Sequence, residues 1–504
     1  MLAFFGEEAV RRAIEDLARS DRVTVLAGAG ASMEIGLPSW EGLVLALLDN
    51  VVDARGWTED AERFRNFALG SGLLATAEII TALVGPRAMP AAIKRHLYGD
   101  TDPAGLLPGP LARGIAAVQH EFGPGTRVAT TNYDEVLEAA LRERPTGQRW
   151  WAHVRSSVEP DVAVSADTVT VTHLHGLLGR RDRGTIVLAE GDYQRMQLDR
   201  SWQEEWMVDA LRTTTCLFVG ASMTDANLIR YLYRARGGVD RRPHVALFRR
   251  REAPTAMERR FRSRAEQADS ARWERLGITP LYADTFADVA QFVHEVAYRR
   301  ECGRRTYLPL PDRVADWFAV EAEEGSLYGA EDEGYQEVQQ LLQEALEGLI
   351  DDVRTLLAHE GVDTRSERIG LALWALHPPE PGGMEERATI LASSDRVMTS
   401  VDSIAPVPLE DWSGFTGVKA ICRGVPLEEE KDTYASRWRF VLGFPVYSDS
   451  PRMPLGALTV ATMTPAPDTA LAGLPARVAN ALNELVVRSA RTLLNISALD
   501  PDSV

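Results

Sequence analysis

Cysteine is scarce in this chain of 504 residues. The three cysteines are Cys216, Cys302 and Cys422, which lie far apart and form no Cys-x-x-Cys pair. A disulfide framework needs paired cysteines and a four-cysteine zinc site needs four thiolates, so this count excludes both. We therefore expect no metal.

Long hydrophobic runs are also absent. No stretch reaches the roughly 18 consecutive apolar residues of a membrane-spanning helix. The apolar patch of residues 2–5 is shorter than the core of a secretion signal, and acidic residues follow it at once. We expect a cytoplasmic protein without a membrane partner.

Positive charge is deficient, and the deficit is uneven. The net charge is −18; residues 306–504 hold 15 Lys and Arg against 32 Asp and Glu, and residues 1–305 hold 40 against 41. The second half is therefore strongly acidic, which speaks against a nucleic-acid partner.

The chain is too long for one ordinary core, and its two halves differ in charge. Both facts indicate two units with different tasks.

In the first 300 residues, strand-like runs alternate with helical patterns. The strand-like runs are VTVLAG, TRVATTN, TVTVTHLHG, TIVLA, TCLFVG, HVALF and ITPLYA. Several are continuously apolar, as strands covered on both faces are. This order predicts an α/β Rossmann-like parallel sheet, with a helical insertion over residues 55–120.

The pattern changes after residue 305. Residues 321–334 are acidic and punctuated by glycine, which predicts an exposed linker. A helical stripe follows, then the strand-like runs RIGLALWALHP, ERATILASSD, VKAICRG, RWRFVLGFPVYS and LGALTVATM, and a last helix over LPARVANALNELVVRSARTLLN. This order predicts an α+β domain with an antiparallel sheet. We place the domains at 1–305 and 335–504, with the acidic linker at 306–334.

A glycine turn stands at VTVLAGAGASMEIGLPSW, residues 23–40. An apolar run breaks there into Gly28, Ala29, Gly30 and Ser32 before a helical pattern begins, which is one way that proteins hold a phosphate. The turn has no Gly-Lys-Ser/Thr, and residue 33 is methionine where the dinucleotide fingerprint has glycine. A purely structural glycine turn is the alternative.

Three further strand ends carry polar residues. They are Thr131, Asn132 and Asp134 in ATTNYDEVLEAAL, His175 in THLHGLLG, and Gly220, Ser222 and Asp225 in LFVGASMTDANLIRYL. Parallel strands present their carboxyl ends at one edge, where ligands bind. The alternatives are that Asn132 and Asp134 serve a helix N-terminus, that His175 is a structural or surface histidine, and that Ser222 begins a capping box.

The ordered set GAGAS…GLP, TTNYD, HLHG and VGASMTDANL resembles the SIR2 family over about residues 1–300. The resemblance implies that NAD+ is bound and consumed. It implies that Asn132 contacts the nicotinamide ribose and orients a water molecule, and that His175 is the general base. It further implies an NAD+ site at Gly28, Ala29, Gly30, Ser32, Thr131, Asp134, Gly220, Ser222 and Asp225.

Two departures from the family's protein deacylases stand out. The paired cysteines of their zinc module are missing, and Pro38 leads to Ser39-Trp40 where they continue to Phe-Arg. The chain thus resembles prokaryotic SIR2-like NAD+ hydrolases of anti-phage defence, which release nicotinamide and ADP-ribose. Cyclisation, a non-catalytic NAD+ or ADP-ribose sensor, and a deacylase or ADP-ribosyltransferase stay open as alternatives.

Residues 335–497 resemble a GAF domain in their order of strands and turns. The resemblance implies a small-molecule ligand or a protein trigger at this domain and a homo-oligomer built on its helices. The alternative is that the helix stripes merely cover the sheet. Arg437 and Arg439 alternate with Trp438 and Phe440, which predicts one strand face for both arginines. We assign neither Cys422 nor His377 as a haem or bilin ligand.

Overall fold

The computed structural model describes residues 2–57, 60–99, 101–143, 153–159, 167–198, 201–236, 242–253, 255–323, 332–377, 386–396, 405–431, 436–448 and 451–494. The chain divides into two compact units. Residues 12–283 and 292–305 form one, called here the parallel-sheet unit. Residues 1–11, 284–291 and 306–504 form the other, the antiparallel-sheet unit.

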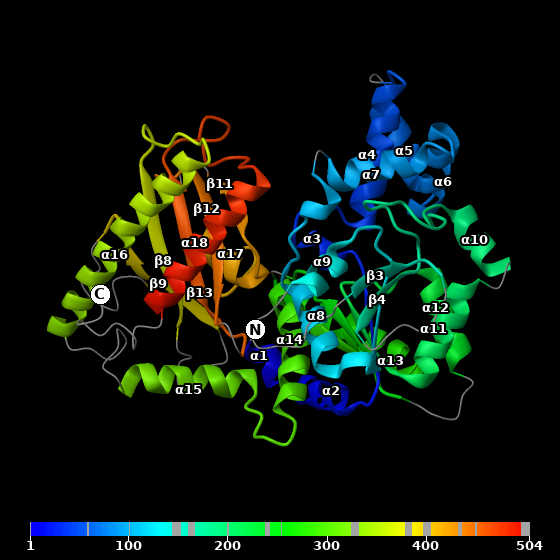
Figure 1. The fold of residues 1–504 in the computed structure, drawn as a ribbon, viewed down its shortest axis with the longest axis horizontal. Coiled ribbons are helices and arrows are strands. Elements are labelled where there is room, and N and C mark those ends of the chain that lie inside the picture. Colours follow the sequence, from blue (N-terminus) through cyan, green and yellow to red (C-terminus); the bar gives the residue numbers. More distant parts are fainter. Residues whose placement is uncertain are drawn as a thin grey trace. The chain divides into compact units, whose positions relative to one another are not determined.

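Figure 1 shows the helices and strands in chain order. Up to residue 302 they are α1 (Leu2–Gly6), α2 (Glu8–Arg19), β1 (Val23–Ala27), α3 (Gly30–Met33), α4 (Trp40–Ala54), α5 (Ala61–Gly70), α6 (Leu73–Val84), α7 (Met89–Tyr98), α8 (Pro110–Phe122), β2 (Thr126–Thr130), α9 (Val136–Arg142), β3 (His153–Ser157), β4 (Thr168–His173), α10 (Glu190–Leu198), α11 (Trp202–Thr213), β5 (Thr215–Val219), α12 (Ala226–Ala235), β6 (His244–Arg249), α13 (Ala256–Arg275), β7 (Ile278–Ala283) and α14 (Phe286–Cys302). After it come α15 (Leu310–Glu323), α16 (Asp332–His359), β8 (Ile369–His377), β9 (Arg387–Ser393), β10 (Val407–Pro408), α17 (Thr416–Arg423), β11 (Leu427–Glu430), β12 (Phe440–Tyr447), β13 (Pro454–Thr462) and α18 (Ala476–Leu494).

The parallel-sheet unit is built on a seven-stranded sheet in the order β3-β4-β2-β1-β5-β6-β7. All its neighbouring strands run parallel, and Val23 of β1 pairs with both Thr126 of β2 and Thr215 of β5. From β1 the chain first adds strands on one side of the sheet, β2 to β4, and then on the other side, β5 to β7. The switch point therefore lies between β1 and β5, and open α/β sheets hold their ligands at such a point. The predicted Rossmann-like α/β class is confirmed.

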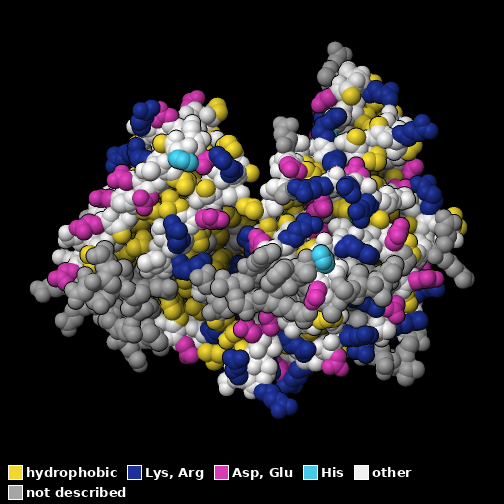
Figure 2. Space-filling model, in the orientation of Figure 1, with side chains coloured by type: hydrophobic (Ala, Val, Ile, Leu, Met, Phe, Trp, Pro, Cys, Tyr) yellow, Lys and Arg dark blue, Asp and Glu magenta, His cyan; other side chains and the backbone are white. Residues whose placement is uncertain are grey.

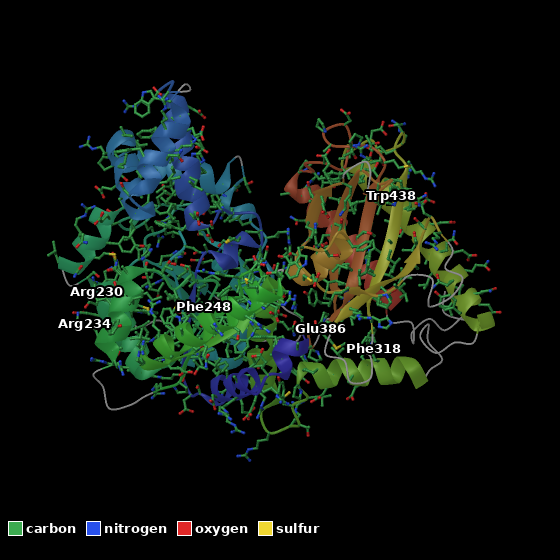
Figure 3. All side chains as sticks on the ribbon, turned by 180° about the vertical axis from the view of Figure 1, so that it is seen from behind. Arg230, Arg234, Phe248, Phe318, Glu386 and Trp438 are labelled. Carbon is green, nitrogen blue, oxygen red and sulfur yellow. The ribbon has the colours of Figure 1, made fainter. Side chains whose placement is uncertain are left out.

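The centre of this sheet is buried on both faces. Every residue of β1 and β5 is buried, as the continuous apolar runs predicted. Phe218 of β5 packs in a core with Trp206 and Met207 of α11. The buried carboxylate of Glu204 pairs with Arg230 and Arg234 of α12. Figure 3 labels the two arginines.

The helical insertion is confirmed: among the described residues of 55–120, helices α5–α8 form and no strand does. Two details of the sequence-based assignment need correction. TIVLA (185–189) forms no strand; it is an extended segment whose Val187 amide donates to the His175 carbonyl at 3.0 Å. Strand β3 was not predicted, because its sequence HVRSS is polar and only Ser157 is buried.

The antiparallel-sheet unit holds a six-stranded sheet in the order β10-β9-β8-β13-β12-β11, which confirms the predicted α+β class. Helices α16 and α18 contact each other and pack on the sheet, and α17 also packs on β12 and β13. Every residue of β13 is buried, as a strand covered on both faces must be. The apolar stripes of α16 and α18 therefore cover the sheet of this unit, which was the alternative to a role in oligomers.

Two predictions about this unit are wrong, and two strands were missed. VKAICRG is not a strand: it lies in α17, because Val418, Ile421 and Cys422 recur on one helical face that is buried. The strands β10 and β11 were not predicted. Arg437 lies before β12 begins, and it pairs with Asp395.

Part of the predicted linker is a helix, α15, and residues 324–331 of that linker lie outside the described residues. On the face shown in Figure 2, both charge signs are scattered among hydrophobic side chains. Among the described residues, no helix is both long and apolar enough to cross a membrane.

Two leucines of α16 test the packing of this helix on the sheet. Leu346 is 0% exposed and Leu341 is 42% exposed. We expect Leu346→Ala to lower the free energy of unfolding by about 2–5 kcal/mol, because it leaves a cavity. Leu341→Ala, the matched control, should change it by less than about 0.5 kcal/mol. Thermal unfolding of the full chain measures both, and equal losses would contradict the packing.

Candidate active site

Four strand ends meet at the carboxyl edge of the parallel sheet. β1 leads into Gly28, β2 into Asn132, β4 into His175 and β5 into Gly220. Strands β4, β2, β1 and β5 are consecutive in the sheet. The residues predicted from four separate segments therefore share one edge at the switch point.

The glycine turn is packed directly against the loop after β5. A Cβ on Gly28 would lie 2.6 Å from the Cα of Ala221, and one on Gly30 would lie 2.6 Å from the Cα of Gly220. Gly220 itself has a φ of +61°, a backbone conformation that residues other than glycine rarely adopt. The Gly30 amide donates to the Gly220 carbonyl at 2.8 Å. Backbone packing is thus sufficient reason for these glycines, and their predicted contact with pyrophosphate stays a prediction.

A hydrogen-bond network joins the ends of β1 and β2. The Asn132 Nδ2 donates to the Gly28 carbonyl at 3.0 Å and to the Ser32 Oγ at 2.9 Å. The Ser32 hydroxyl donates to Asp134 Oδ2 at 2.8 Å, and Asp134 Oδ1 accepts from the Val136 amide at 3.1 Å. Burial raises the pKa of Asp134. Asn132 is not a helix cap, because the residue before α9 is Glu135.

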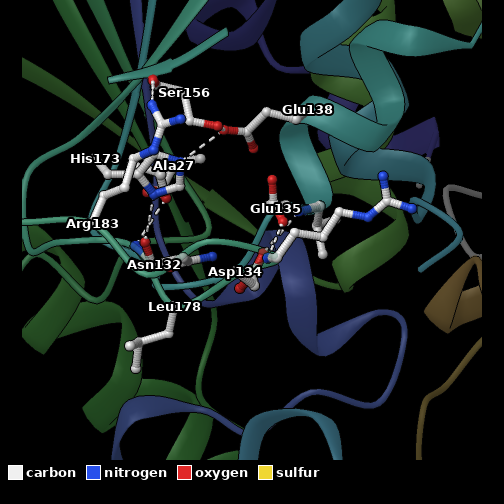
Figure 4. A network of polar contacts seen from close by, with 12 residues as sticks. Ala27, Asn132, Asp134, Glu135, Glu138, Ser156, His173, Leu178 and Arg183 are labelled. Carbon is white, nitrogen blue, oxygen red and sulfur yellow. Dashed lines mark hydrogen bonds and ion pairs between the residues drawn. The ribbon is translucent and has the colours of Figure 1, made fainter. Parts of the chain in front are cut away.

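Behind Asn132 lies a buried pair that the sequence did not reveal (Figure 4). His173 Nδ1 lies 3.0 Å from the Asn132 carbonyl oxygen, and His173 Nε2 lies 2.8 Å from Glu138 Oε1. Ser156 donates to the same carboxylate oxygen at 2.6 Å. Burial alone would lower the pKa of His173, but Glu138 outweighs it, so the pKa of His173 is raised and that of Glu138 is lowered.

His175 lies in a second cluster, with residues of α10 and α12. Its Nε2 lies 3.4 Å from Asp225 Oδ2, and Tyr193 donates its hydroxyl to the same oxygen at 3.0 Å. The rings of His175 and Tyr193 meet edge to face at 5.6 Å. Burial lowers the pKa of His175, and Asp225 and Asp192 offset part of this effect. His175 is therefore a neutral imidazole near pH 7.

The predicted capping box at Ser222 is wrong. Asp225 is the N-cap of α12 and accepts from the Leu228 amide at 2.9 Å, whereas Ser222 is exposed and bonds Thr224. Asn at this position would cap equally well.

Met223, in the same loop, has a φ of 57° and is the one non-glycine residue among those described with positive φ. Such strain is common near functional sites.

The structure brings most of the predicted residues together, but not all of them. Ala29 and Thr131 are half-buried in the same turns, and the Thr131 amide donates to the Ala27 carbonyl at 3.3 Å. Ser222 makes no contact with either cluster among the hydrogen bonds of the described residues. His173, Glu138 and Tyr193 were missed. The signal for His173 was a histidine inside a strand-like run, because a buried histidine needs a hydrogen-bond partner.

Within the described ranges, no group of three His, Cys, Asp or Glu side chains could hold a metal ion.

Comparison with known proteins finds similarity over part of this unit. Residues 126–281 match the family model of the SIR2-like domain. A segment of 174 residues is 28% identical to the NAD(+) hydrolase ThsA of Bacillus cereus, covering 33% of this chain and 35% of that protein. An uncharacterized protein of Sinorhizobium fredii is 25% identical over 288 residues, or 54% of this chain and 22% of its own length. The chain thus spans about a third or less of these two relatives.

Among solved structures, a complex of a SIR2 homolog with NAD is similar with a TM-score of 0.28 and 13% sequence identity. The match covers 58% of this chain and 94% of that one.

The pair of His173 and Glu138 gives the protein a pH-dependent stability. Its contribution is full between the ordinary pKa of Glu, 4.5, and that of His, 6.5, because the folded state lowers the first and raises the second. It is lost as pH rises through the folded pKa of His173, and as pH falls through that of Glu138. We expect Glu138→Gln to cost about 3–5 kcal/mol inside this window, and less outside it.

Thermal unfolding across pH measures this difference. Glu143→Gln, which breaks the exposed pair with Arg113, is the matched control and should cost under about 1 kcal/mol. A loss for Glu138→Gln that does not vary with pH would contradict the charged pair.

Proposed function

We propose, from the premise that the chain carries a SIR2-like domain over residues 126–281, that it is an NAD+ hydrolase. The observation that carries the proposal is the placement of Asn132 and His175 at neighbouring strand ends, beside the glycine turn of β1. The segment that is similar to an NAD(+) hydrolase of Bacillus cereus adds support. The products are nicotinamide and ADP-ribose.

The reaction breaks the bond between the ribose C1′ and the nicotinamide nitrogen. The electron pair of this bond leaves with nicotinamide, which becomes neutral, and positive charge develops on the sugar. A water oxygen then bonds to C1′ and loses a proton to a base. The protein therefore has to hold the ribose, place one water molecule and accept one proton.

Asn132 is suited to hold the ribose or the water as an acceptor. Both hydrogens of its amide are used, on the Gly28 carbonyl and the Ser32 hydroxyl. Its Oδ1 is therefore the atom that accepts a hydrogen bond from a ribose hydroxyl or from water. The same two bonds fix the rotamer of Asn132 before substrate arrives, which is the preorganisation that catalysis needs.

His175 is suited to accept the proton. Its pKa is lowered by burial, so the imidazole is neutral and basic near pH 7. Gly28, Ala29, Gly30 and Thr131 then line the diphosphate, and Gly220 and Ser222 the adenosine. Ser32 and Asp134 act through Asn132, since their side chains are already bonded to it or to each other.

We extend the proposal to the whole chain. A protein that destroys NAD+ must be silent in a healthy cell, and the antiparallel-sheet unit has its own core and carries most of the net negative charge. We assign this GAF-like unit the control of an anti-phage effector, through a small-molecule ligand or protein trigger and through homo-oligomers.

Release of nicotinamide from NAD+ by the purified full chain tests the activity. We expect His175→Ala to lower the rate by about 10²–10⁴-fold, the usual effect of losing an acid–base group. Asn132→Ala should lower it by about 10²-fold or more, because the ribose and the water are no longer positioned. His359→Ala is the matched control, because the side chain of His359 is 86% exposed on α16. Its rate should equal that of the wild type.

The same variants are compared in cells under phage infection, where a resting enzyme would be switched on. Loss of cellular NAD+ with the wild type but not with His175→Ala supports the proposal. NAD+ that is bound but consumed under neither condition would overturn it, and would favour the non-catalytic sensor.

A further inference from the structure

Asp225 uses its two carboxylate oxygens for two different purposes. Oδ1 accepts from the Leu228 amide at 2.9 Å and caps α12. Oδ2 faces the other way, lying 3.0 Å from the Tyr193 hydroxyl and 3.4 Å from His175 Nε2. Asn or Ser would cap the helix as well as Asp does. The cap therefore does not explain why a carboxylate stands here.

We propose that Asp225 is a positioning residue for His175. Its Oδ2 holds the hydrogen of the imidazole on Nε2, so that Nδ1 carries the free electron pair and is the atom that takes the proton. This inference rests on the proposed function for the role of His175. The inference goes beyond the proposed function because it assigns the tautomer of His175, the atom that accepts the proton and the residue that positions the ring.

A charge is needed at this position because His175 is 7% exposed. When the imidazole accepts a proton it becomes a buried cation, which is costly unless a counter-charge lies close by. The groups that face it are Asp225, the N-cap residue of α12, and Asp192 and Tyr193 from α10. Of the two carboxylates, Asp192 uses Oδ2 to accept from the amides of Leu188 and Ala189, and its Oδ1 pairs with Arg195. This leaves Oδ2 of Asp225 as the carboxylate oxygen in contact with the ring.

Tyr193 completes the arrangement. Its hydroxyl donates to Asp225 Oδ2, and its ring lies edge to face against the imidazole of His175. The carboxylate and the ring are thus both held by one side chain of α10. The separation of 3.4 Å between His175 and Asp225 is longer than a strong hydrogen bond. Catalytic hydrogen bonds commonly tighten when substrate binds.

The proton inventory is simple. Water gives one proton to Nδ1 of His175 as its oxygen bonds to C1′, and the imidazolium then carries hydrogen on both nitrogens. The hydrogen on Nε2 stays with the ring, and Asp225 stays ionised, as the acid of a Ser-His-Asp triad does.

Kinetics of nicotinamide release by the full chain tests the assignment. Asp225→Asn keeps the cap, but its amide donates to Nε2 and leaves the hydrogen on Nδ1; we expect kcat to fall by about 10²–10⁴-fold, by analogy with the Asp-to-Asn change in a triad. Asp225→Ser keeps the cap without the charge, and kcat should fall at least about 10-fold. In Asp225→Ser the acidic limb of the pH–rate profile should move to lower pH, because the carboxylate raises the pKa of His175.

Thr255→Ala is the control for loss of a cap, because Thr255 caps α13 with a capping box away from this cluster. It should lower the unfolding temperature and leave kcat unchanged. Wild-type kcat and an unchanged pH profile in Asp225→Asn and Asp225→Ser would show that Asp225 only caps α12, and would overturn the proposal.

Nitrogen NMR of 15N-histidine-labelled full chain tests the tautomer without any activity. The His175 signals are identified by their absence in His175→Gln. Nε2–H in the wild type and Nδ1–H in Asp225→Asn would support the proposal, even if the wild type hydrolysed no NAD+. The same tautomer in both proteins would overturn it, even if the wild type were active.

Discussion

The contact between two backbone turns determines the rest of the site. The turn at Gly28–Gly30 and the turn at Gly220 approach so closely that no side chain fits between them. This closeness directs the Gly28 carbonyl toward Asn132 and brings Ser32 within reach of Asp134. Since β1 lies between β2 and β5, one turn positions groups on both sides. A larger residue at Gly30 would therefore disturb Asn132 without touching it.

The site is also defined by how buried polar groups are satisfied. Asp134, Glu138, His173 and His175 are all buried, and each has a named partner. A buried charge without a partner is costly, so each group restricts the position of the next. The result is a connected set of side chains, from which the proposed function uses Asn132 Oδ1 and one nitrogen of His175 for the ligand.

Periodicity and turn chemistry predicted much of this from the sequence. Apolar runs ending in glycine or polar residues located β1, β2, β4 and β5, and with them Asn132 and His175. TIVLA was assigned as a strand because the run is mostly apolar, yet no neighbouring strand pairs with it. VKAICRG was misassigned because a short apolar run does not distinguish helix from strand. Tyr193 and Glu138 could not be found, since only the fold brings them to the histidines.

His173 and His175 show why the fold matters more than the motif. Both belong to HLHG, two residues apart, and both are buried. His173 lies 2.8 Å from Glu138 and its pKa is raised, which suits a charged structural pair. His175 lies 3.4 Å from Asp225, which also accepts from Tyr193 and Leu228, and its pKa is lowered. Glu138 hydrogen-bonds the imidazole of His173 and outweighs the effect of burial, whereas the more distant Asp225 offsets only part of it for His175. The neutral histidine is the one that the proposed function uses as a base.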